Sequence, residues 1–481
     1  MSNDFDKLIS GNETYNRTKK RNIFLYHSYM GGDVYKKGEY LTKYVNESES
    51  EYEERIRVTP LDNHAAGVIG LYNSFLFRTP PHRTWGRLEN DPTIHPFQLD
   101  ADLEGRSLNS FMKDVNTYAG IFGHSWVIVS KPNTNARTRA DELDQGVRPY
   151  LSIVSPLVML DWNYSRSASG HYVLDYVKYI EEQTEDTQVI KQWYPEVVLT
   201  HTVDINKNEV LNTVTETNGI GVVPAVCVYS SRSHARGVGI PLINDIVDLQ
   251  RAIYNEYSEI EQNIRLSGHP SLVKSASTEA GAGPGSIIQM EDGMDAGLRP
   301  YLLQPTGASV QSLYTSIAHK VEAIDRIAHL GAIRETTGRT ISGVSRQIEF
   351  EQLNARLSEI ADNLELAEEQ IMRFYATYQG TAWDGEVEYP ESFNIRDTAT
   401  DLNLYITALS APVSSATYRK EVEENIAKTV LGSDIDNYNQ IHQEIWGGFE
   451  PHAMVNNSGD RVMAQDQATH MQLLAAGYRE E

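Results

Sequence analysis

Cysteine is almost absent from this sequence, because Cys227 is the only one in 481 residues. A disulfide framework within the chain is therefore excluded, and a reducing compartment fits this composition. Cys227 lies in the apolar run 222–229, where a lone cysteine is typically a small buried hydrophobic residue. The 14 histidines contain no His-x-x-x-His pair, and no Cys-rich spacing exists, so neither a zinc site nor any other metal site is predicted.

Long apolar runs are also missing. No stretch reaches ~18 consecutive apolar residues, and residues 1–22 lack the apolar core of a signal peptide. We therefore expect a soluble protein made in a cell's cytoplasm, with no membrane partner.

Positive charge is scarce. The chain has 42 Lys and Arg against 66 Asp and Glu, which gives a formal net charge of −24. Proteins that grip nucleic acid neutralise phosphates with basic side chains, so tight non-specific DNA binding over the whole surface is excluded. Handling of DNA by repulsion remains compatible with this charge.

Motifs that bind nucleotide phosphates are missing as well. The glycine-rich segment 281–285 (GAGPG) lacks the Gly-Lys-Ser/Thr ending of a Walker A loop, and 219–224 (GIGVVP) leads into a strand instead of a helix. No cofactor and no ATPase activity are expected.

Acidic and histidine candidates for catalysis are weak. The pairs Asp100/Asp102 and Asp434/Asp436 could supply acid and base carboxylates, yet nothing places them across a cleft. His124, beside Trp126 at the start of a strand, is expected to be buried and structural. No catalytic residue is predicted.

Three apolar stripes with helical spacing are the most informative pattern present. They recur every three or four positions, which places each stripe on one face of an α-helix. Their members are Leu242, Ile246, Leu249, Ile253, Tyr257, Ile260 and Ile264; then Val310, Leu313, Ile317, Val321, Ile324 and Ala328; then Phe350, Leu353, Leu357, Ile360, Leu364, Ala367, Ile371, Phe374 and Tyr378. At about 1.5 Å per residue the third helix would span roughly 55 Å. On pattern alone it is a long core or coiled-coil helix.

Two segments separate these helices. Residues 267–306 contain the glycine-rich stretch and two short apolar pieces, which predicts a small β-containing tip on a helical stalk. Residues 331–343 (GAIRETTGRTISG) are too polar and glycine-rich for a core and predict a mobile loop. With Arg334 and Arg339 it is either an ordinary surface loop or a loop that reaches a polyanion.

The rest of the chain predicts an α+β domain and terminal helices. Residues 1–47, with a basic cluster at 17–21, are expected to be a solvated or extended arm. Ser48 and Glu51 form a capping box at the start of a helix. Antiparallel strands are expected at 125–130, 150–154, 172–180, 189–194, 197–203 and 225–229. Two helices lie between 402 and 432, and the chain from 447 is expected to be loosely ordered.

The order of these parts resembles the portal protein of tailed bacteriophages, in which they are called wing, stem, clip, tunnel loop and crown. Local sequence segments over about residues 29–432 are similar to those of that family. They are GEYLTKYVNESESEYEERI, FLFRTPP, LDADLEGRSLNSFMKDV, GHSWVIVSKP, RPYLSIVSPLVMLDW, GIGVVPAV and PLINDIVDLQRAIYNEYSEIEQNIRLSGHPSLV. The sequence departs from it at 123–126 (GHSW), where such portals often have a Gly-Arg or Gly-Lys turn, and the tail offers no landmark.

The resemblance implies an α+β portal-type fold with an α+β wing, a helical stem, a small α/β clip, a long tunnel helix and a helical crown, assembled as a ring. The implied parts are an N-terminal arm 1–47, wing 48–239, stem helix 240–266, clip 267–306, second stem helix 307–331, tunnel loop 332–343, long helix and connector 344–394, crown helices 395–446 and flexible tail 447–481.

The same resemblance implies a non-enzymatic role at the head–tail vertex of a virion. Such portals are homo-oligomeric rings, commonly of twelve subunits, through which double-stranded DNA passes without sequence specificity. The terminase large subunit docks on the clip and a tail adaptor later replaces it, and the major capsid protein or a scaffold is a further partner.

The resemblance also assigns candidate site residues. The tunnel loop would face DNA with Arg334, Glu335, Thr336, Thr337, Arg339 and Thr340, and the clip would present an acidic docking surface with Glu279, Glu291, Asp292 and Asp295. Two other classes stay open: another ring-forming head–tail protein, such as an adaptor, and an acidic α+β hydrolase. Adaptors are usually shorter and lack the stem, clip, stem order.

Overall fold

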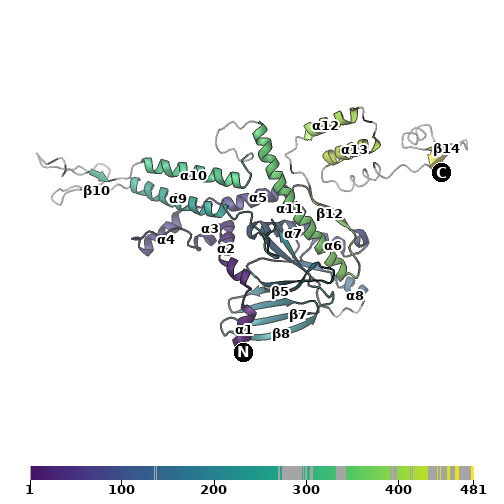
Figure 1. Cartoon of the computed structure of the whole chain (residues 1–481), viewed down its shortest axis with the longest axis horizontal. Coiled ribbons are helices and arrows are strands. Elements are labelled where there is room, and N and C mark those ends of the chain that lie inside the picture. Colours follow the sequence, from purple (N-terminus) through teal and green to yellow (C-terminus); the bar gives the residue numbers. More distant parts are fainter. Residues whose placement is uncertain are drawn as a thin grey trace. The chain divides into compact units, whose positions relative to one another are not determined.

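The computed structural model describes residues 2–134, 136, 138–268, 271–273, 295, 297, 301–303, 307–331, 343–390, 393, 398–411, 413, 415–431, 441, 445, 452–455, 461–464 and 478–480. It is a mixed α and β structure (Figure 1). The chain divides into two compact units, Met1–Phe393 and Asn394–Glu481, and each is described by itself.

The N-terminal segment is helical and is part of the folded unit. It forms α1 (Ser2–Ile9), α2 (Glu13–Met30) and α3 (Gly32–Lys36), and Asn12 caps α2 by accepting a hydrogen bond from the Tyr15 N–H. Phe24 and Leu25 are buried in the main core. The prediction of a solvated or extended arm over 1–47 is therefore wrong. One residue of the basic cluster, Arg21, pairs with Asp248 at 2.8 Å, so tertiary contacts hold this segment in place.

The next helix begins where the sequence predicts it. α4 (Glu49–Val58) begins with the predicted capping box of Ser48 and Glu51, and α5 (His64–Leu76) follows it. After the short strand β1 (His82–Thr84) and the 3-10 turn η1 (Gly86–Leu88) come α6 (Ile94–Leu99) and α7 (Leu108–Phe122).

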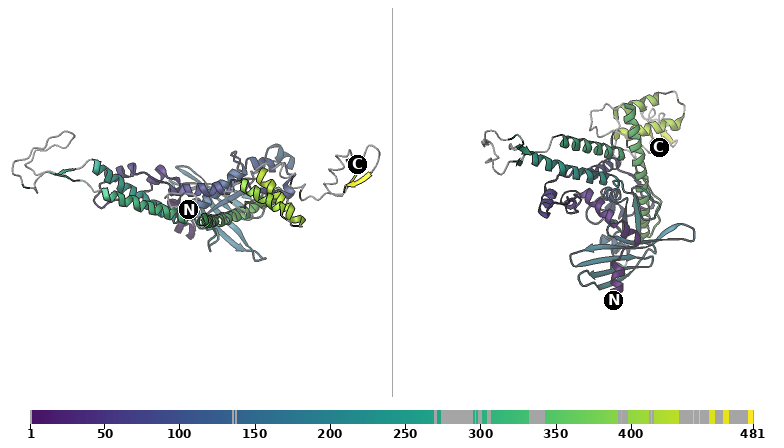
Figure 2. Two further views of the ribbon diagram at one scale, coloured as in Figure 1. Left: turned by 90° about the horizontal axis from the view of Figure 1, so that it is seen from above. Right: turned by 60° about the vertical axis from the view of Figure 1, so that its left-hand side comes forward.

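Two antiparallel sheets follow α7, as the strand pattern predicts. The first has the order β3-β2-β9, with β2 (His124–Ser130), β3 (Tyr150–Val154) and β9 (Ala225–Tyr229), and α8 (Arg139–Asp144) lies between β2 and β3 in sequence. The second has the order β4-β5-β6-β7-β8: β4 (Met159–Arg166), β5 (Tyr172–Gln183), β6 (Thr187–Trp193), β7 (Val197–Asp204) and β8 (Glu209–Thr217). The edge strands β4 and β8 were not predicted. Helix α1 lies against this sheet, where Phe5 packs on Ile190 and Val203 (Figure 2, right).

A helical hairpin and a long helix complete the first unit. α9 (Ile246–Gly268) and α10 (Gly307–Ile327) lie side by side in Figures 1 and 2, and the strands β10 (Ser271–Val273) and β11 (Tyr301–Leu303) pair at their far end. α11 (Gly343–Tyr378) has 36 residues, about 54 Å at 1.5 Å per residue. The short strand β12 (Glu386–Glu388) then pairs with β1.

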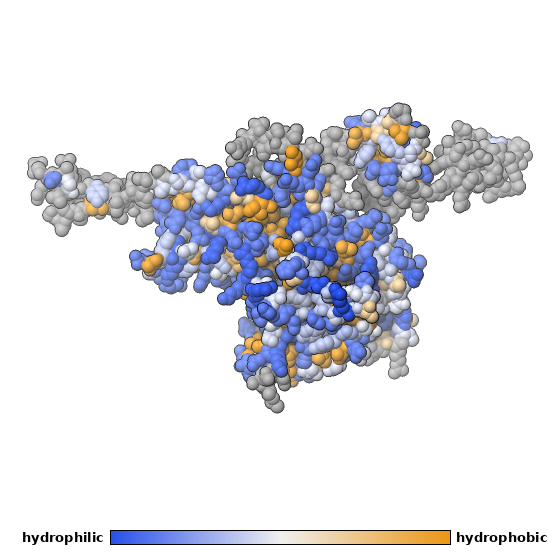
Figure 3. Space-filling model, viewed as in Figure 1, coloured by the Kyte–Doolittle hydropathy of each residue, from blue (hydrophilic) through white to orange (hydrophobic). Residues whose placement is uncertain are grey.

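The second unit contains the two predicted terminal helices, α12 (Thr398–Ser410) and α13 (Ala416–Leu431). Apolar side chains are exposed on this helix pair (Figure 3). Leu404 of α12 and Val430 of α13 are 63% and 62% exposed. The tail differs from the expectation of loose order, because β13 (His452–Val455) pairs with both β14 (Arg461–Ala464) and β15 (Arg479–Glu480).

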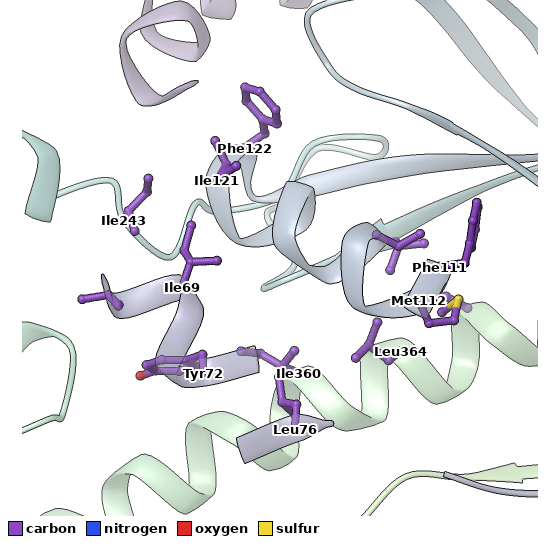
Figure 4. Packing of buried hydrophobic residues seen from close by; sticks show 14 of the residues in the cluster. Ile69, Tyr72, Leu76, Phe111, Met112, Ile121, Phe122, Ile243, Ile360 and Leu364 are labelled. Carbon is purple, nitrogen blue, oxygen red and sulfur yellow. The ribbon is translucent and has the colours of Figure 1, made fainter. Parts of the chain in front are cut away.

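The main core of the first unit lies where α5, α7 and α11 meet. Figure 4 shows Tyr72 and Leu76 of α5, Phe111 and Met112 of α7, and Leu364 of α11 pointing into one cluster. All five side chains are almost fully buried. The predicted apolar stripe of α11 therefore faces α5 and α7 of its own chain, as a long core helix does.

Candidate functional site

The α9–α10 hairpin is held by the apolar stripes that its sequence predicts. Ile246, Ile253 and Ile260 of α9 are buried, as are Ile317 and Ile324 of α10. Other members of the stripes are partly buried against the same core: Leu242, Leu249, Tyr257, Val310, Leu313 and Val321. The stripe becomes exposed toward the far end of α9, since Ile264 is 49% exposed.

A polar clamp joins the two helices halfway along the hairpin. The Glu256 carboxylate of α9 accepts hydrogen bonds at 2.7 Å from both Ser316 Oγ and Lys320 Nζ of α10. The Glu256 and Lys320 side chains are only 20% and 25% exposed. Because a pair at this depth is partly desolvated, it fixes which residues of the two helices face each other.

Two buried polar residues fix the base of the hairpin to the body. Gln250 of α9 accepts a hydrogen bond from the Ala65 N–H at 2.9 Å and donates one to the Ser28 carbonyl at 3.0 Å. Arg55 of α4 donates to Ser258 of α9 at 3.0 Å and forms a buried ion pair with Glu47 at 2.6 Å. The direction in which the hairpin leaves the body is therefore set by specific hydrogen bonds.

The far end of the hairpin is the segment that the sequence suggests as a docking surface. In it β10 and β11 pair antiparallel, with Leu272 opposite Leu302. Asp295 is exposed, and its carboxylate accepts a hydrogen bond from the Gly297 N–H at 3.3 Å. Glu279, Glu291 and Asp292 lie outside the described residues.

The polar segment between α10 and α11 is flanked on both sides by residues that contact α5. After α10 the chain is anchored by the buried Tyr72 hydroxyl of α5, which donates to the Ala328 carbonyl at 2.9 Å. Burial raises the pKa of Tyr72 to about 12, so the hydroxyl keeps its proton at neutral pH. On the α11 side, Phe350 packs edge-on against Phe75 of α5 at 6.3 Å between ring centroids.

The two ends also lie close to each other. A Cβ added to Gly331 would lie 3.0 Å from Oε2 of Glu349 in α11. The segment thus leaves the body and returns to it over the same helix, α5. Its predicted DNA-facing residues, Arg334, Glu335, Thr336, Thr337, Arg339 and Thr340, lie outside the described residues.

The other end of α11 is held by a buried ionic network that sequence reasoning missed. The Arg83 guanidinium of β1 contacts the Glu368 carboxylate of α11, and the Tyr389 hydroxyl donates to the same carboxylate at 2.8 Å. The side chains of Arg83 and Glu368 are 10% and 0% exposed. Burial alone lowers the pKa of Arg83, but Glu368 and Tyr389 outweigh it and the pKa lies above its usual value. No local sequence signal marks partners 285 residues apart.

His124 and Cys227 lie in the first sheet. His124 is buried, as predicted, and its Nδ1 accepts a hydrogen bond from the Gly239 N–H at 3.2 Å. Burial lowers the pKa of His124 to about 4, which keeps the imidazole neutral. Cys227 is partly buried beside the smaller core cluster of this sheet, and burial raises the pKa of its thiol to about 12.

The acidic pair at 100 and 102 does not form a catalytic dyad. Asp100 pairs with Arg148 at 3.0 Å, whereas Asp102 pairs with Arg106. Burial by itself raises the pKa of Asp102, but hydrogen bonds from the Glu104 N–H and from Arg106 outweigh it, so this pKa lies below its usual value. Asp434 and Asp436 lie outside the described residues.

Within the ranges that the structure describes, no group of three or more His, Cys, Asp or Glu side chains is arranged to hold a metal ion. In those same ranges no helix combines the length and the apolar character that crossing a membrane requires.

Comparison with known proteins gives matches among solved structures only. No protein-family model matches the chain, and no curated protein matches it. A chain from the neck of an empty GTA particle, computed with C6 symmetry, is 10% identical, with a TM-score of 0.46 over 76% of this chain and 91% of that one. A chain from the virion of a native gene transfer agent (GTA) particle is 10% identical, with a TM-score of 0.43 over 74% and 89%. A chain from the neck of a native GTA particle, computed with C12 symmetry, is 9% identical, with a TM-score of 0.42 over 74% and 89%.

Proposed function

We propose that this chain is the portal subunit of a tailed bacteriophage. In this role it forms a homo-oligomeric ring, of twelve copies, at one vertex of the head. Double-stranded DNA passes through the centre of the ring during packaging and ejection. The chain acts as a conduit and docking platform and has no enzymatic activity of its own.

The observation that carries this proposal is the order in which structural elements follow one another along the chain around α5. A clamped helical hairpin ends in a small strand pair and returns to α5; a polar segment leaves and re-enters over that same helix; a helix of 36 residues then crosses the core. This order supports the assignment of stem, clip, tunnel loop and tunnel helix. The residues that flank this segment are held by α5, which would give a loop that touches a moving polymer a fixed base.

Exposed apolar side chains on the hairpin support assembly with further copies. Ile264, Tyr314 and Ile327 are 49%, 46% and 42% exposed. A helical hairpin covers only one stripe of each helix, so neighbouring copies arranged around an axis would cover more of this surface.

The charge of the chain suits a channel. Each copy has a formal charge of −24, so a ring lined by such copies repels the duplex instead of holding it. Within the tunnel loop, Arg334 and Arg339 would contact phosphates transiently, without sequence preference. The other loop residues, Glu335, Thr336, Thr337 and Thr340, would keep the contact weak.

Electron microscopy of the purified full-length chain tests the ring directly. We expect closed rings with a central opening in negative stain, and a mass of many subunits by analytical ultracentrifugation. A chain that remains a compact monomer at all accessible concentrations refutes the proposal.

The tunnel loop is tested in particles that package DNA. Arg334→Ala/Arg339→Ala should leave the ring intact and change the amount of DNA packaged or the rate of its ejection. Lys113→Ala, at an exposed position on α7, is the matched control and should change neither. Unchanged packaging and ejection in the loop variant would show that these arginines do not contact DNA.

The clip is tested by charge reversal at its acidic residues, Glu279, Glu291, Asp292 and Asp295. We propose that they bind a basic surface of the terminase large subunit and later of the tail adaptor. Reversal at these positions should weaken capture of both partners by preformed rings, whereas unchanged capture contradicts the docking role.

A further inference from the structure

Two arginines converge on one tyrosine ring at an end of the five-stranded sheet. The guanidinium carbon of Arg166, in β4, lies 4.9 Å from the centroid of the Tyr172 ring in β5, and that of Arg236 lies 3.4 Å from the same centroid. The backbone at Arg236 is fixed, because its carbonyl accepts a hydrogen bond from Trp162 Nε1 at 3.1 Å. Arg166, Tyr172 and Arg236 are called the arginine cluster below.

This cluster stands out because the chain has carboxylates in excess. At least eleven of its other arginines form ion pairs with Asp or Glu side chains. Arg166 and Arg236 are both exposed, and neither forms an ion pair with a carboxylate among the described residues. Both guanidinium groups lie against the Tyr172 ring. The distance between their carbon atoms therefore cannot exceed the sum of their two distances to the ring centroid, so the two like charges are held close together. The cluster is therefore ordered in advance to bind an anionic group from outside the chain.

The opposite end of the same strand is acidic. Glu182, near the end of β5, and Glu185 and Asp186, in the turn from β5 into β6, are all exposed, and the three are called the acidic β5–β6 turn below. Glu182 and Glu185 form no ion pair within the described part of the chain, and Asp186 only accepts a hydrogen bond from Asn206 at 2.7 Å. Along β5, Tyr172 of the arginine cluster and Glu182 of the acidic turn are separated by roughly 33 Å at ~3.3 Å per residue.

We propose that the arginine cluster of one subunit binds the acidic β5–β6 turn of the next subunit in the ring. This inference rests on the proposed ring assembly and names one of its contacts. A closed ring needs a head-to-tail contact between two different surfaces of the same subunit, and β5 has complementary surfaces at its two ends. Local charge pairing of this kind also sets the register between copies that repel each other overall.

A second copy of this chain is favoured over nucleic acid as the partner. The net charge of −24 repels DNA within the screening length of about 8 Å at physiological ionic strength, and two arginines do not reverse the sign of that field. The acidic turn, in contrast, is present at the same concentration as the cluster in every assembly of the chain.

Charge reversal tests the contact with the full-length chain. Arg166→Glu/Arg236→Glu and, separately, Glu182→Arg/Glu185→Arg should each raise the protein concentration needed for assembly at least about tenfold, measured by analytical ultracentrifugation. The milder Arg166→Gln/Arg236→Gln variant should shift it in the same direction by less. Lys20→Glu/Lys113→Glu makes the same change in charge as the arginine reversal, at exposed helical positions; it is the control for that variant and should assemble as the wild type does.

Mixing the two reversed variants gives the decisive measurement. The reversed, acidic cluster of one variant complements the reversed, basic turn of the other, and their unchanged surfaces complement each other as in the wild type. An equimolar mixture should therefore assemble into rings in which the two variants alternate. The variant with all four reversals should also assemble. Failure of both, with each variant folded by circular dichroism, overturns the inference.

The outcomes separate this contact from the ring itself. Wild-type rings together with unaffected assembly of the Arg166→Glu/Arg236→Glu variant overturn the contact alone, whereas a monomeric wild type overturns the ring and the contact together. Reduced DNA binding in a gel-shift assay with unchanged assembly would identify the cluster as a nucleic-acid contact and likewise overturn the inference.

Discussion

Neutralising Glu368 should be among the most damaging single changes to the first unit. Glu368→Gln retains the shape of the side chain and an acceptor for the Tyr389 hydroxyl, but leaves the Arg83 guanidinium without its opposite charge. Both side chains are almost fully buried, so solvent screens the loss little, and breaking such a pair costs about 3–5 kcal/mol. The unit Met1–Phe393 unfolds with an entropy of about 0.8 kcal/mol/K at ~2.1 cal/mol/K per residue, so the melting temperature should fall by about 4–6 °C.

Differential scanning calorimetry at pH 7 measures this effect. The double variant Arg83→Met/Glu368→Gln removes both charges and should be destabilised by clearly less than the sum of its two single variants. Arg373→Met/Glu369→Gln is the matched control, because this pair lies on the same helix with side chains 60% and 23% exposed, and it should shift the melting temperature by about 1 °C or less. A Glu368→Gln melting temperature equal to that of the wild type, or strict additivity in the double variant, would refute the reasoning.

Three further predictions concern the first sheet. Burial lowers the pKa of His124 from 6.5 to about 4, so the neutral imidazole stabilises the fold fully above pH 6.5. This contribution, at most about 3 kcal/mol, is lost as the pH falls toward 4. His124→Asn should therefore flatten the dependence of the melting temperature on pH between 7 and 4.5. A Cβ at Gly239 would lie 1.9 Å from the carbonyl oxygen of Gly123, so Gly239→Ala should lower the melting temperature by several degrees, whereas Gly219→Ala, in open space, should not. With the thiol pKa raised to about 12, Cys227 should react with iodoacetamide at pH 8 only after unfolding, as mass spectrometry would detect; rapid labelling of the native chain contradicts this.

The helices with unbroken apolar stripes were the easiest elements to predict. In α11 the members of the predicted stripe from Leu353 to Tyr378 are buried or pack against the core, and Phe350 packs against Phe75 of α5. The start of the helix at Gly343 and its end at Tyr378 also agree with the pattern. A stripe of this length specifies both the helix and the face it buries, because both follow from local spacing.

Elements whose partners are distant in sequence were predicted poorly. In α2 the buried residues Phe24 and Leu25 follow a run of basic residues, and the ion pair of Arg21 with Asp248 forms only once α9 is in place. The edge strand β8 was missed for a different reason. Nearly all of its residues are exposed, so no buried face imposes the alternation that marks a strand.

The candidate sites also combine features that are visible in the local sequence with features that depend on contacts between distant residues. The polar segment after α10 is visible in the sequence as a break between two stripes, but the contact of Gly331 with Glu349 depends on how α10 and α11 meet over α5. The arginine cluster depends on the register of β4 with β5, in which Arg166 lies opposite Tyr172. It also depends on the loop that contains Arg236 and brings this side chain over the Tyr172 ring.

The meeting of Gly331 with Glu349 has a consequence for how this protein can vary. Since the ends of the intervening stretch are already closed by Tyr72, Phe75 and Phe350, doubling its length would add only about 0.6 kcal/mol of closure entropy. Insertions, deletions or a transplanted peptide at 332–342 should leave the flanking helices undisturbed. In the ring proposed above, the width of the central opening could therefore change one residue at a time, without any redesign of the scaffold that surrounds it.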